Sequence, residues 1–384
     1  MYRFRKKINY ILAFLLDAFL RLLSMARGPS RPTGRHNESN VAWLWVRLDH
    51  LGDVFLATAA AKAIKAHDPS HRVVFLVATQ SAALLQNNPY IDEIWCLDAP
   101  WHFAGGWRKF LSNLKAVYKK MELSNICTVF LPRGDVRENI LFGFLRHYQS
   151  YGYGVTGGGI LLSHRVEYAN GVHESRHSQD LLSAAGVLVR TFEPGVFFAN
   201  GEEKALGRNT EWLGLNPGEP YGVFLIEAGT RAKEWPRELI DAWLLQAHKI
   251  KFSGKWVLAA KDASRWKNLI EFVNEKKLDR VVNAIGKLSF RELLFLLKNA
   301  EVCVGFDSGP THIAAWSGPK TLFLFSGTNS LNEWGSLSPK AMHIQKQVPC
   351  IQCALRHCQV TDHPCMSQIR PEEVVAALSR ALED

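Results

Sequence analysis

"VCVGFDSGPTHIAAW" (residues 302–316) joins a short apolar run to a helical pattern through a turn of unusual chemistry. The run at 302–306 holds no polar side chain, as expected for a strand buried on both faces of a parallel sheet. Such strands alternate with helices, and ligands bind beyond the carboxyl ends of the strands. The stretch therefore predicts an α/β fold with a binding loop at 307–312.

The same strand–turn–helix unit recurs in two series along the chain. We expect strands of the first series at 42–48, 73–79, 94–97 and 126–132. We expect strands of the second series at 222–228, 256–261, 281–286, 302–307 and 320–326, before a last helix at 371–383. Continuous apolar strands separated by helices indicate parallel sheets covered on both faces, so we predict two doubly wound, Rossmann-like domains facing a cleft.

Between about residues 191 and 220 the alternation stops, and Gly, Pro and charged residues accumulate, which is typical of a domain boundary. A chain of 384 residues also fits two domains better than one. We therefore predict an arm with a linker at 1–36, an N-terminal domain at 37–205, and a C-terminal domain at 206–384.

Seven of the ten net positive charges lie in residues 1–36, where eight Lys or Arg residues oppose Asp17 alone. The rest of the chain is nearly neutral, so we expect no nucleic-acid partner. Apolar residues recur at helical spacing from Phe4 to Leu23, but Asp17 and Arg21 interrupt them. A spanning helix needs about 20 mostly apolar residues, so this segment is a poor membrane span.

Three interpretations of this arm stay open. The leading one is an amphipathic helix that lies among lipid headgroups, with its basic residues on an anionic membrane surface. A secretory signal is the second, because a basic start, an apolar stretch and "SMA" (24–26) are present. The third is a helix that packs on its own domain.

The turn at 307–312 has the composition of an anion site. Free N–H groups and the dipole of a helix start attract negative charge, and glycine permits close approach of a phosphate. Proline suits the first helical turn, while hydroxyls and imidazole add donors. The candidate residues are Asp307, Ser308, Gly309, Pro310, Thr311 and His312. The alternative is an ordinary turn in which Asp307 only caps the helix.

Two further loops follow predicted strands. "EAGTRAKEWP" (227–236) supplies Thr230 and Lys233, and a cation opposite a helix start can hold a diphosphate from both sides. The alternative for Lys233 is a solvated surface lysine. "RLDHLGDVFLAT" (47–58) places Asp53 at a helix start after Gly52, where the carboxylate is either a general base or an N-cap.

Four stretches resemble the bacterial heptosyltransferases of glycosyltransferase family 9. They are "LGDVFLATAAAKAIKAHDP" (51–69), "GTRAKEWP" (229–236), "IGKLSFRELLFLLKNA" (285–300) and "GFDSGPTHIAAW" (305–316). The resemblance runs from about residue 41 to the C-terminus. It implies a GT-B fold and an inverting transfer of heptose from ADP-L-glycero-β-D-manno-heptose to the inner core of lipopolysaccharide.

The resemblance also implies roles for single residues. Asp53 matches the catalytic base, and Lys233 matches a phosphate-binding lysine. Asp307, Ser308, Gly309, Pro310 and His312 match the diphosphate loop, and Leu288 lies near a residue of the nucleoside pocket. No "DxD" stands beside these loops, so we expect no catalytic metal.

Two positions depart from the family pattern. The family often carries a Glu after the strand at 256–261 that binds the nucleoside ribose, whereas this chain reads "KDASRW" (261–266), with Asp262 as a possible substitute. The Gly-containing stretch after the next strand reads "FSGTNSLNEW" (325–334), with Ser326 and Gly327 in altered order. These departures leave the exact sugar nucleotide open.

Cys350, Cys353, Cys358 and Cys365 follow a C-x2-C-x4-C-x6-C pattern. Four thiolates within sixteen residues suit a structural zinc or iron ion, and related autotransporter heptosyltransferases carry an iron-binding cysteine cluster in this region. Two disulfides or four free thiols are the alternatives. The other cysteines, Cys96, Cys127 and Cys303, lie in predicted strands, where we expect them to be buried.

We therefore predict an inverting glycosyltransferase, peripheral on the cytoplasmic face of the inner membrane, with an ADP-sugar donor and a lipid-linked oligosaccharide acceptor. Two other functions stay open: heptosylation of an autotransporter protein, and a non-catalytic scaffold that binds a nucleotide sugar.

Overall fold

The computed structural model describes residues 7–26, 41–102, 106–143, 148–215 and 218–383, with the side chains of 7–12 and 23–26 left out. The chain divides into two compact units, Met1–Pro194 and Gly195–Asp384. Residue 205, after which we expected the boundary, lies inside helix α7 (Glu202–Asn209) of the second unit. Ion pairs from Glu202 to Arg291 and from Glu203 to Lys298 bind α7 to helix α10 (Phe290–Asn299) of the second unit.

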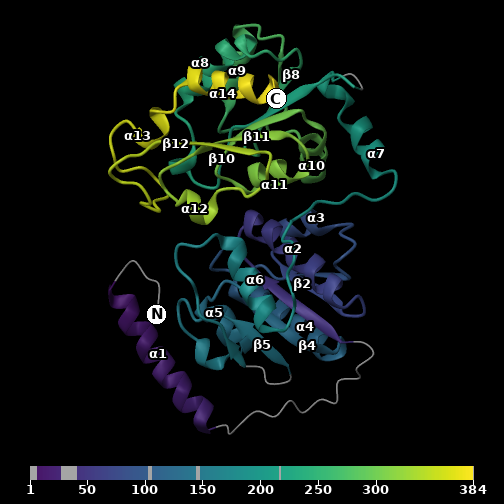
Figure 1. The fold of residues 1–384 in the computed structure, drawn as a ribbon, viewed down its shortest axis with the longest axis vertical. Coiled ribbons are helices and arrows are strands. Elements are labelled where there is room, and N and C mark those ends of the chain that lie inside the picture. The colour runs from purple at the N-terminus through teal and green to yellow at the C-terminus, as the bar shows by residue number, and fades with distance from the viewer. Residues whose placement is uncertain (1–6, 27–40, 103–105, 144–147, 216–217, 384) are drawn as a thin grey trace. The chain divides into compact units, whose positions relative to one another are not determined.

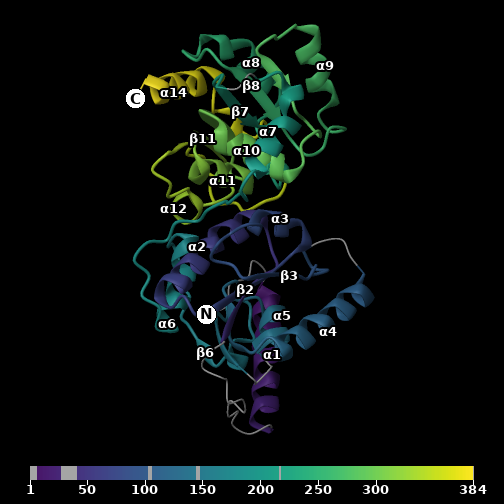
Figure 2. The same ribbon diagram turned by 90° about the vertical axis from the view of Figure 1, so that its right-hand side faces the viewer.

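The first unit contains one parallel sheet in the order β3-β2-β1-β4-β5-β6. Its strands are β1 (Ala42–Arg47), β2 (Arg72–Val77), β3 (Glu93–Cys96), β4 (Ile126–Leu131), β5 (Gln149–Gly152) and β6 (His164–Arg165). Its main helices are α2 (Leu51–His67), α4 (Trp107–Leu123) and α6 (Glu174–Ala184), with short helices α3 (Ala82–Leu85) and α5 (Val136–Glu138). Helices α2 and α6 lie side by side in both views (Figures 1 and 2).

The second unit repeats this topology with the order β12-β11-β10-β7-β8-β9. Its strands are β7 (Tyr221–Leu225), β8 (Lys255–Ala259), β9 (Val281–Asn283), β10 (Val302–Phe306), β11 (Lys320–Phe325) and β12 (Ala341–Gln345). Its other helices are α8 (Arg237–Gln246), α9 (Lys267–Glu275), α11 (Gly309–Ser317), α12 (Leu331–Trp334), α13 (Pro364–Ser367) and α14 (Pro371–Glu383). The predicted fold class, two doubly wound parallel sheets, is confirmed.

The connectivity of each sheet reverses at its centre, between β1 and β4 in the first unit and between β7 and β10 in the second. Loops at such a switch point leave the sheet in opposite directions and open a crevice beyond the carboxyl ends of the strands. Asp53 follows β1, Lys233 follows β7 and Asp307 follows β10. All three predicted site residues therefore stand at switch points.

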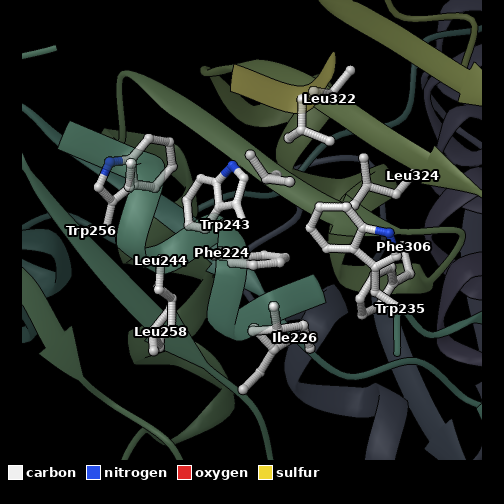
Figure 3. Packing of buried hydrophobic residues seen from close by; sticks show 14 of the residues in the cluster. Phe224, Ile226, Trp235, Trp243, Leu244, Trp256, Leu258, Phe306, Leu322 and Leu324 are labelled. Carbon is white, nitrogen blue, oxygen red and sulfur yellow. The ribbon is translucent and has the colours of Figure 1, made fainter. Parts of the chain in front are cut away.

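Large aromatic side chains fill the core beneath the second sheet (Figure 3). Phe224 of β7 meets the indole of Trp243 edge to face, and Trp243 meets Trp256 of β8 in the same way. Trp235 ends the Lys233 loop, and its indole N–H donates to the carbonyl oxygens of Met366 and Ile369 at 3.1 and 3.0 Å. The core thus fixes the far end of the loop that carries Lys233.

The predicted helix of the arm is present as α1 (Lys7–Ala26), but no described helix is long and apolar enough to cross a membrane. Asp17 accepts a 2.6 Å hydrogen bond from the backbone N–H of Gly158, and Ala13 and Leu20 are buried beside it. Phe14, Leu15, Phe19 and Leu22 are each more than half exposed. The basic residues at 1–6 and the linker at 27–36 lie outside the described residues.

Cys96, which we expected to be buried, is exposed because β3 is the edge strand of the first sheet. Cys303, in the central strand β10, is fully buried, and burial raises the pKa of its thiol well above the ordinary range. Cys127 is partly buried.

Candidate functional site

An ion pair joins the two predicted donor loops of the second unit. The Nζ of Lys233, at the end of the 3-10 turn Arg231–Lys233, lies 2.6 Å from Oδ2 of Asp307. Asn329 donates a 2.8 Å hydrogen bond to the same oxygen, and Nε2 of His312 lies 3.5 Å from Oδ1. Loops after β7, β10 and β11 therefore converge on one carboxylate.

Asp307 is buried, and burial alone would raise its pKa. The hydrogen bond from His312 and the charge of Lys233 outweigh that effect and lower the pKa to about 2. Asp307 is therefore ionised at neutral pH and holds Lys233 and Asn329 in fixed positions. The sequence pattern did not single out Asn329, although it follows β11, the neighbour of β10 in the sheet.

The anion site that the sequence predicts lies at the start of α11. Ser308 is the N-cap residue in extended conformation, proline occupies the first turn, and the hydroxyls of Ser308 and Thr311 lie 3.0 Å apart. Residues 308–310 are half-buried, so the helix start remains accessible, while Thr311 and His312 are buried. Asp307 does not cap α11, because no side chain caps this helix.

Two buried polar atoms near these loops have no hydrogen-bond partner among the described residues. They are Oγ1 of Thr230, which precedes the Lys233 turn, and Nδ1 of His312. A buried donor or acceptor without a partner costs about 1–3 kcal/mol, so such atoms accumulate where a ligand completes the set. Both belong to residues that the sequence assigned to donor binding.

Two other sequence candidates lie at neighbouring strand ends. Leu288 is half-buried after β9, directly before the capping box of α10. Asp262, after β8, is exposed, and its Oδ1 accepts from the N–H and hydroxyl of Ser264 in its own turn. Glu227 accepts from the backbone N–H groups of Lys261 and Asp262. Among the described residues, no hydrogen bond or ion pair links Leu288, Asp262 or Glu227 to Lys233 or Asp307.

In the first unit, Asp53 lies in the first turn of α2 and is held by Arg47, the last residue of β1. Nη2 of Arg47 lies 2.7 Å from Oδ1 of Asp53 and 3.1 Å from Oε1 of Glu174, the first residue of α6. Nε of Arg47 lies 3.0 Å from Asp49, whose other oxygen is 2.8 Å from Arg133. The buried guanidinium group of Arg47 thus forms ion pairs with three carboxyl groups, those of Asp49, Asp53 and Glu174.

Asp53 has the electrostatic setting of a base rather than of a simple cap. Its side chain makes no capping hydrogen bond to α2, whose N-cap is His50. Burial and the charge of Asp49 raise the pKa of Asp53, although Arg47 and His50 act to lower it. A carboxylate with a raised pKa accepts a proton more readily than a solvated aspartate does.

Glu138 is the most isolated acid of this cluster. It is fully buried, and neither of its carboxyl oxygens accepts a hydrogen bond from a described residue. Burial, followed by the charge of Asp49, raises the pKa of Glu138 to about 8. Nothing in the sequence singled out Glu138 or Glu174, because Glu138 ends α5 and Glu174 begins α6, and both lie far from Asp53 in the chain.

The cysteine segment is hydrogen-bonded to two of the three loops that converge on Asp307, those after β7 and β11. Backbone N–H groups of Gln352 and Ala354 donate to Gly327 and Thr328, next to Asn329. The carbonyl of Arg356 accepts from the N–H of Ala232, next to Lys233. The charges of Cys358, Cys350 and Cys353 all act on the thiol of Cys365, whose pKa is raised chiefly by burial, so the four thiols share one neighbourhood.

The metal centre itself stays a prediction. Within the part of the chain that the structure describes, no group of three or more His, Cys, Asp or Glu side chains is arranged to hold an ion. The four cysteines are free thiols there, with Cys365 buried and the others partly exposed. Metal binding would require the thiols to move together.

Comparison with known proteins gives matches over most of the chain. The model of glycosyltransferase family 9 (heptosyltransferase) matches residues 199–363. Lipooligosaccharide heptosyltransferase 2 of Campylobacter jejuni is 23% identical over 349 residues, which cover 86% of this chain and 96% of the relative. Two solved structures share the fold.

The first is a family 9 glycosyl transferase from Veillonella parvula, with a TM-score of 0.76, 17% identity and coverage of 89% of this chain and 98% of its own. The second is the Escherichia coli ADP-heptose lipopolysaccharide heptosyltransferase II, with a TM-score of 0.70, 16% identity and the same coverage.

Proposed function

Because this chain belongs to glycosyltransferase family 9, the heptosyltransferases, we propose that it transfers a heptose from ADP-heptose to a lipid-linked inner-core oligosaccharide of lipopolysaccharide. The observation that carries the proposal is the Lys233–Asp307 pair beside the open start of α11. It provides a positioned cation and free N–H groups within one unit.

The second unit would hold the donor through its diphosphate. Lys233 offers one ammonium group, and the first turn of α11 offers backbone donors on which negative charge is favourable. Thr230 and His312 supply the two buried polar atoms without partners. These groups also stabilise the charge that grows on ADP as the bond to the sugar breaks.

The first unit would supply the base. The proton of an acceptor hydroxyl passes to Asp53, and the hydroxyl oxygen forms a bond to the anomeric carbon. The bond from that carbon to the diphosphate breaks, ADP leaves, and the configuration inverts in a single displacement. Arg47 holds the Asp53 carboxylate in place during this step.

The exposed apolar side chains of helix α1 support the proposal that the acceptor is linked to a lipid. The side chains of Phe14, Leu15, Phe19 and Leu22 are each more than half exposed although Asp17 of the same helix is bound to Gly158, and residues 1–36 carry a net charge of +7. An apolar helix face next to excess basic charge fits an interface of anionic lipid. We place the protein at the cytoplasmic face of the inner membrane on this basis.

Release of ADP from ADP-heptose in the presence of a truncated core acceptor tests the proposal. We expect wild-type protein to release ADP and attach one heptose to the acceptor, as seen by mass spectrometry. A protein that binds ADP but never turns over would instead be a nucleotide-sugar-binding scaffold. Activity on an autotransporter polypeptide alone would move the acceptor from lipid to protein.

A further inference from the structure

Asp53 and Glu174 share a single nitrogen of Arg47. The distances of 2.7 and 3.1 Å to Nη2 place both carboxyl groups within hydrogen-bonding reach of the same N–H pair. Each stands at the start of a helix, α2 and α6, and these helices contact each other. The side chain of Glu174 is 15% exposed and that of Arg47 is 5% exposed, so water weakly screens this group of charges.

The charges of the cluster do not balance if every acid is ionised. Five carboxyl groups (Asp49, Asp53, Asp135, Glu138 and Glu174) face three guanidinium groups (Arg47, Arg133 and Arg137). Buried charge without a partner is strongly unfavourable. Two protons on the acids restore neutrality, and the isolated Glu138 takes one of them.

The second proton belongs to the pair on Arg47. Burial raises the pKa of Glu174 to about 7; Arg47 opposes this effect, and the negative charge of Asp53 adds to it. Two carboxyl groups that share one cation titrate as a pair, with the proton held by one while the other is ionised. Asp53, nearer to Arg47, is the ionised partner.

We propose that Glu174 is a positioning residue for the base, sharing Arg47 with Asp53 and holding the proton of the pair so that Asp53 remains a carboxylate. This inference rests on the proposed role of Asp53. A neutral Glu174 leaves Asp53 ready to accept a proton, and an ionised Glu174 draws Arg47 away from it. The protonation state of Glu174 therefore determines how firmly Arg47 holds the carboxylate of Asp53.

The protons balance over one turnover. Asp53 receives the proton of the acceptor hydroxyl and becomes neutral. The charge of Arg47 then interacts mainly with Glu174. Glu174 then ionises and releases its proton to water at its exposed edge. Transfer of the remaining proton from Asp53 to Glu174 restores the starting pair, with one proton released for each heptose transferred.

Other charged groups also face the pair. Asp49 acts on both carboxyl groups, and His50 acts on Asp53 from the N-terminal end of α2. Glu174→Gln is neutral at every pH and keeps the size of the side chain, while Glu174→Asp keeps a titratable carboxyl. Glu193→Gln is a matched control, since Glu193 is an exposed acid of the same unit paired with Lys62.

The test is the pH dependence of kcat from pH 5.5 to 9, measured by ADP release, for wild type, these three variants and Asp53→Asn. Wild type and Glu193→Gln should show a transition near pH 7 that Glu174→Gln lacks and Glu174→Asp retains at a shifted midpoint. At pH 8 wild-type Glu174 is mostly ionised and draws Arg47 away from Asp53, whereas Gln cannot, so the kcat of Glu174→Gln should exceed that of wild type about tenfold at this pH, with donor KM unchanged. A carboxyl carbon resonance that titrates near pH 7 should vanish in the same variant.

Two results would overturn the inference: a Glu174→Gln profile that superimposes on wild type, or an equal fall in Glu174→Gln and Glu174→Asp at every pH, which indicates a structural role. Failure of the proposed function would give a different result from failure of this inference. In that case Asp53→Asn retains wild-type kcat, whatever the Glu174 variants do.

Discussion

The Nζ of Lys233 lies 2.6 Å from Oδ2 of Asp307, and this contact joins the loops after β7 and β10 at the switch point of the second sheet. The carboxylate orients the ammonium group before a ligand arrives. A diphosphate would compete with Asp307 for Lys233, and Asn329 would keep Asp307 partnered when it does. The pair would therefore be a preorganised part of the phosphate site that we propose, and its buried Asp307 distinguishes it from a surface salt bridge.

Lys233→Ala should raise the Kd for ADP about 10- to 100-fold, because a charge-assisted hydrogen bond is lost and the Asp307 charge is exposed to the phosphates. Isothermal titration calorimetry measures this constant. Lys267→Ala is the control, since Lys267 is a largely exposed lysine of the same unit. Equal ADP affinity in both variants and wild type would show that Lys233 does not bind the donor.

Glu138→Gln should make the protein less sensitive to alkaline pH. The pKa of Glu138 is raised from an ordinary value of 4.5 to about 8 in the folded state, so the folded protein holds a proton that the unfolded chain releases. The free energy of unfolding therefore falls as pH rises from about 4.5 to 8, and a permanently neutral Gln removes that loss.

Urea unfolding at pH 6 and pH 8.5 measures the effect of Glu138. Relative to wild type, Glu138→Gln should gain about 2 kcal/mol on going from the lower to the higher pH. Glu193→Gln should show no such gain, because Glu193 is exposed. Parallel pH dependence in wild type and Glu138→Gln would show that Glu138 is ionised in the folded protein.

The double substitution Phe14→Ser with Phe19→Ser should reduce binding to vesicles that contain anionic phospholipid, because it removes two exposed aromatic side chains from α1. Flotation of the full chain measures the bound fraction. Leu188→Ser, another exposed apolar residue of the first unit, serves as the control. Equal flotation of all three proteins would show that the exposed aromatic side chains of α1 do not bind the membrane.

Purified protein should carry about one equivalent of zinc or iron per chain, which elemental analysis measures, if the four-cysteine segment forms the structural site that we propose. Cys350→Ser with Cys353→Ser should lose the metal and weaken ADP binding, since neighbouring residues of this segment are hydrogen-bonded to the loops that carry Lys233 and Asn329. Cys96→Ser, outside the segment, should change neither property. Wild-type protein that contains no metal and binds ADP with full affinity would contradict the proposed metal site.

The two sheets could be predicted because each strand is a continuous apolar run followed by turn residues, as 302–312 illustrates. The same rule, that parallel strands end at one edge, placed Asp53, Lys233 and Asp307 in site loops. It could not find Glu174, because its partner Arg47 lies 127 residues away in the sequence. It could not find Glu138, because the pKa of that residue is raised chiefly by burial, which nothing local in the sequence marks.

The arm illustrates a second limit of the sequence. Asp17 reads as an interruption of an apolar helix, whereas it is the residue that attaches the helix to Gly158. The interpretation of α1 as a helix that packs on its own domain and its interpretation as a membrane helix are therefore compatible, because Asp17 attaches the helix to the protein while four of its large apolar side chains stay exposed.

The most direct test of the central claim compares wild type with Asp53→Asn in ADP release and ADP binding. Asn keeps the shape of Asp53 but cannot accept the proton, so ADP release from ADP-heptose and core acceptor should fall about 100- to 10,000-fold. The Kd for ADP should stay within twofold, because the donor groups belong to the second unit. Wild-type ADP release by Asp53→Asn would contradict the account.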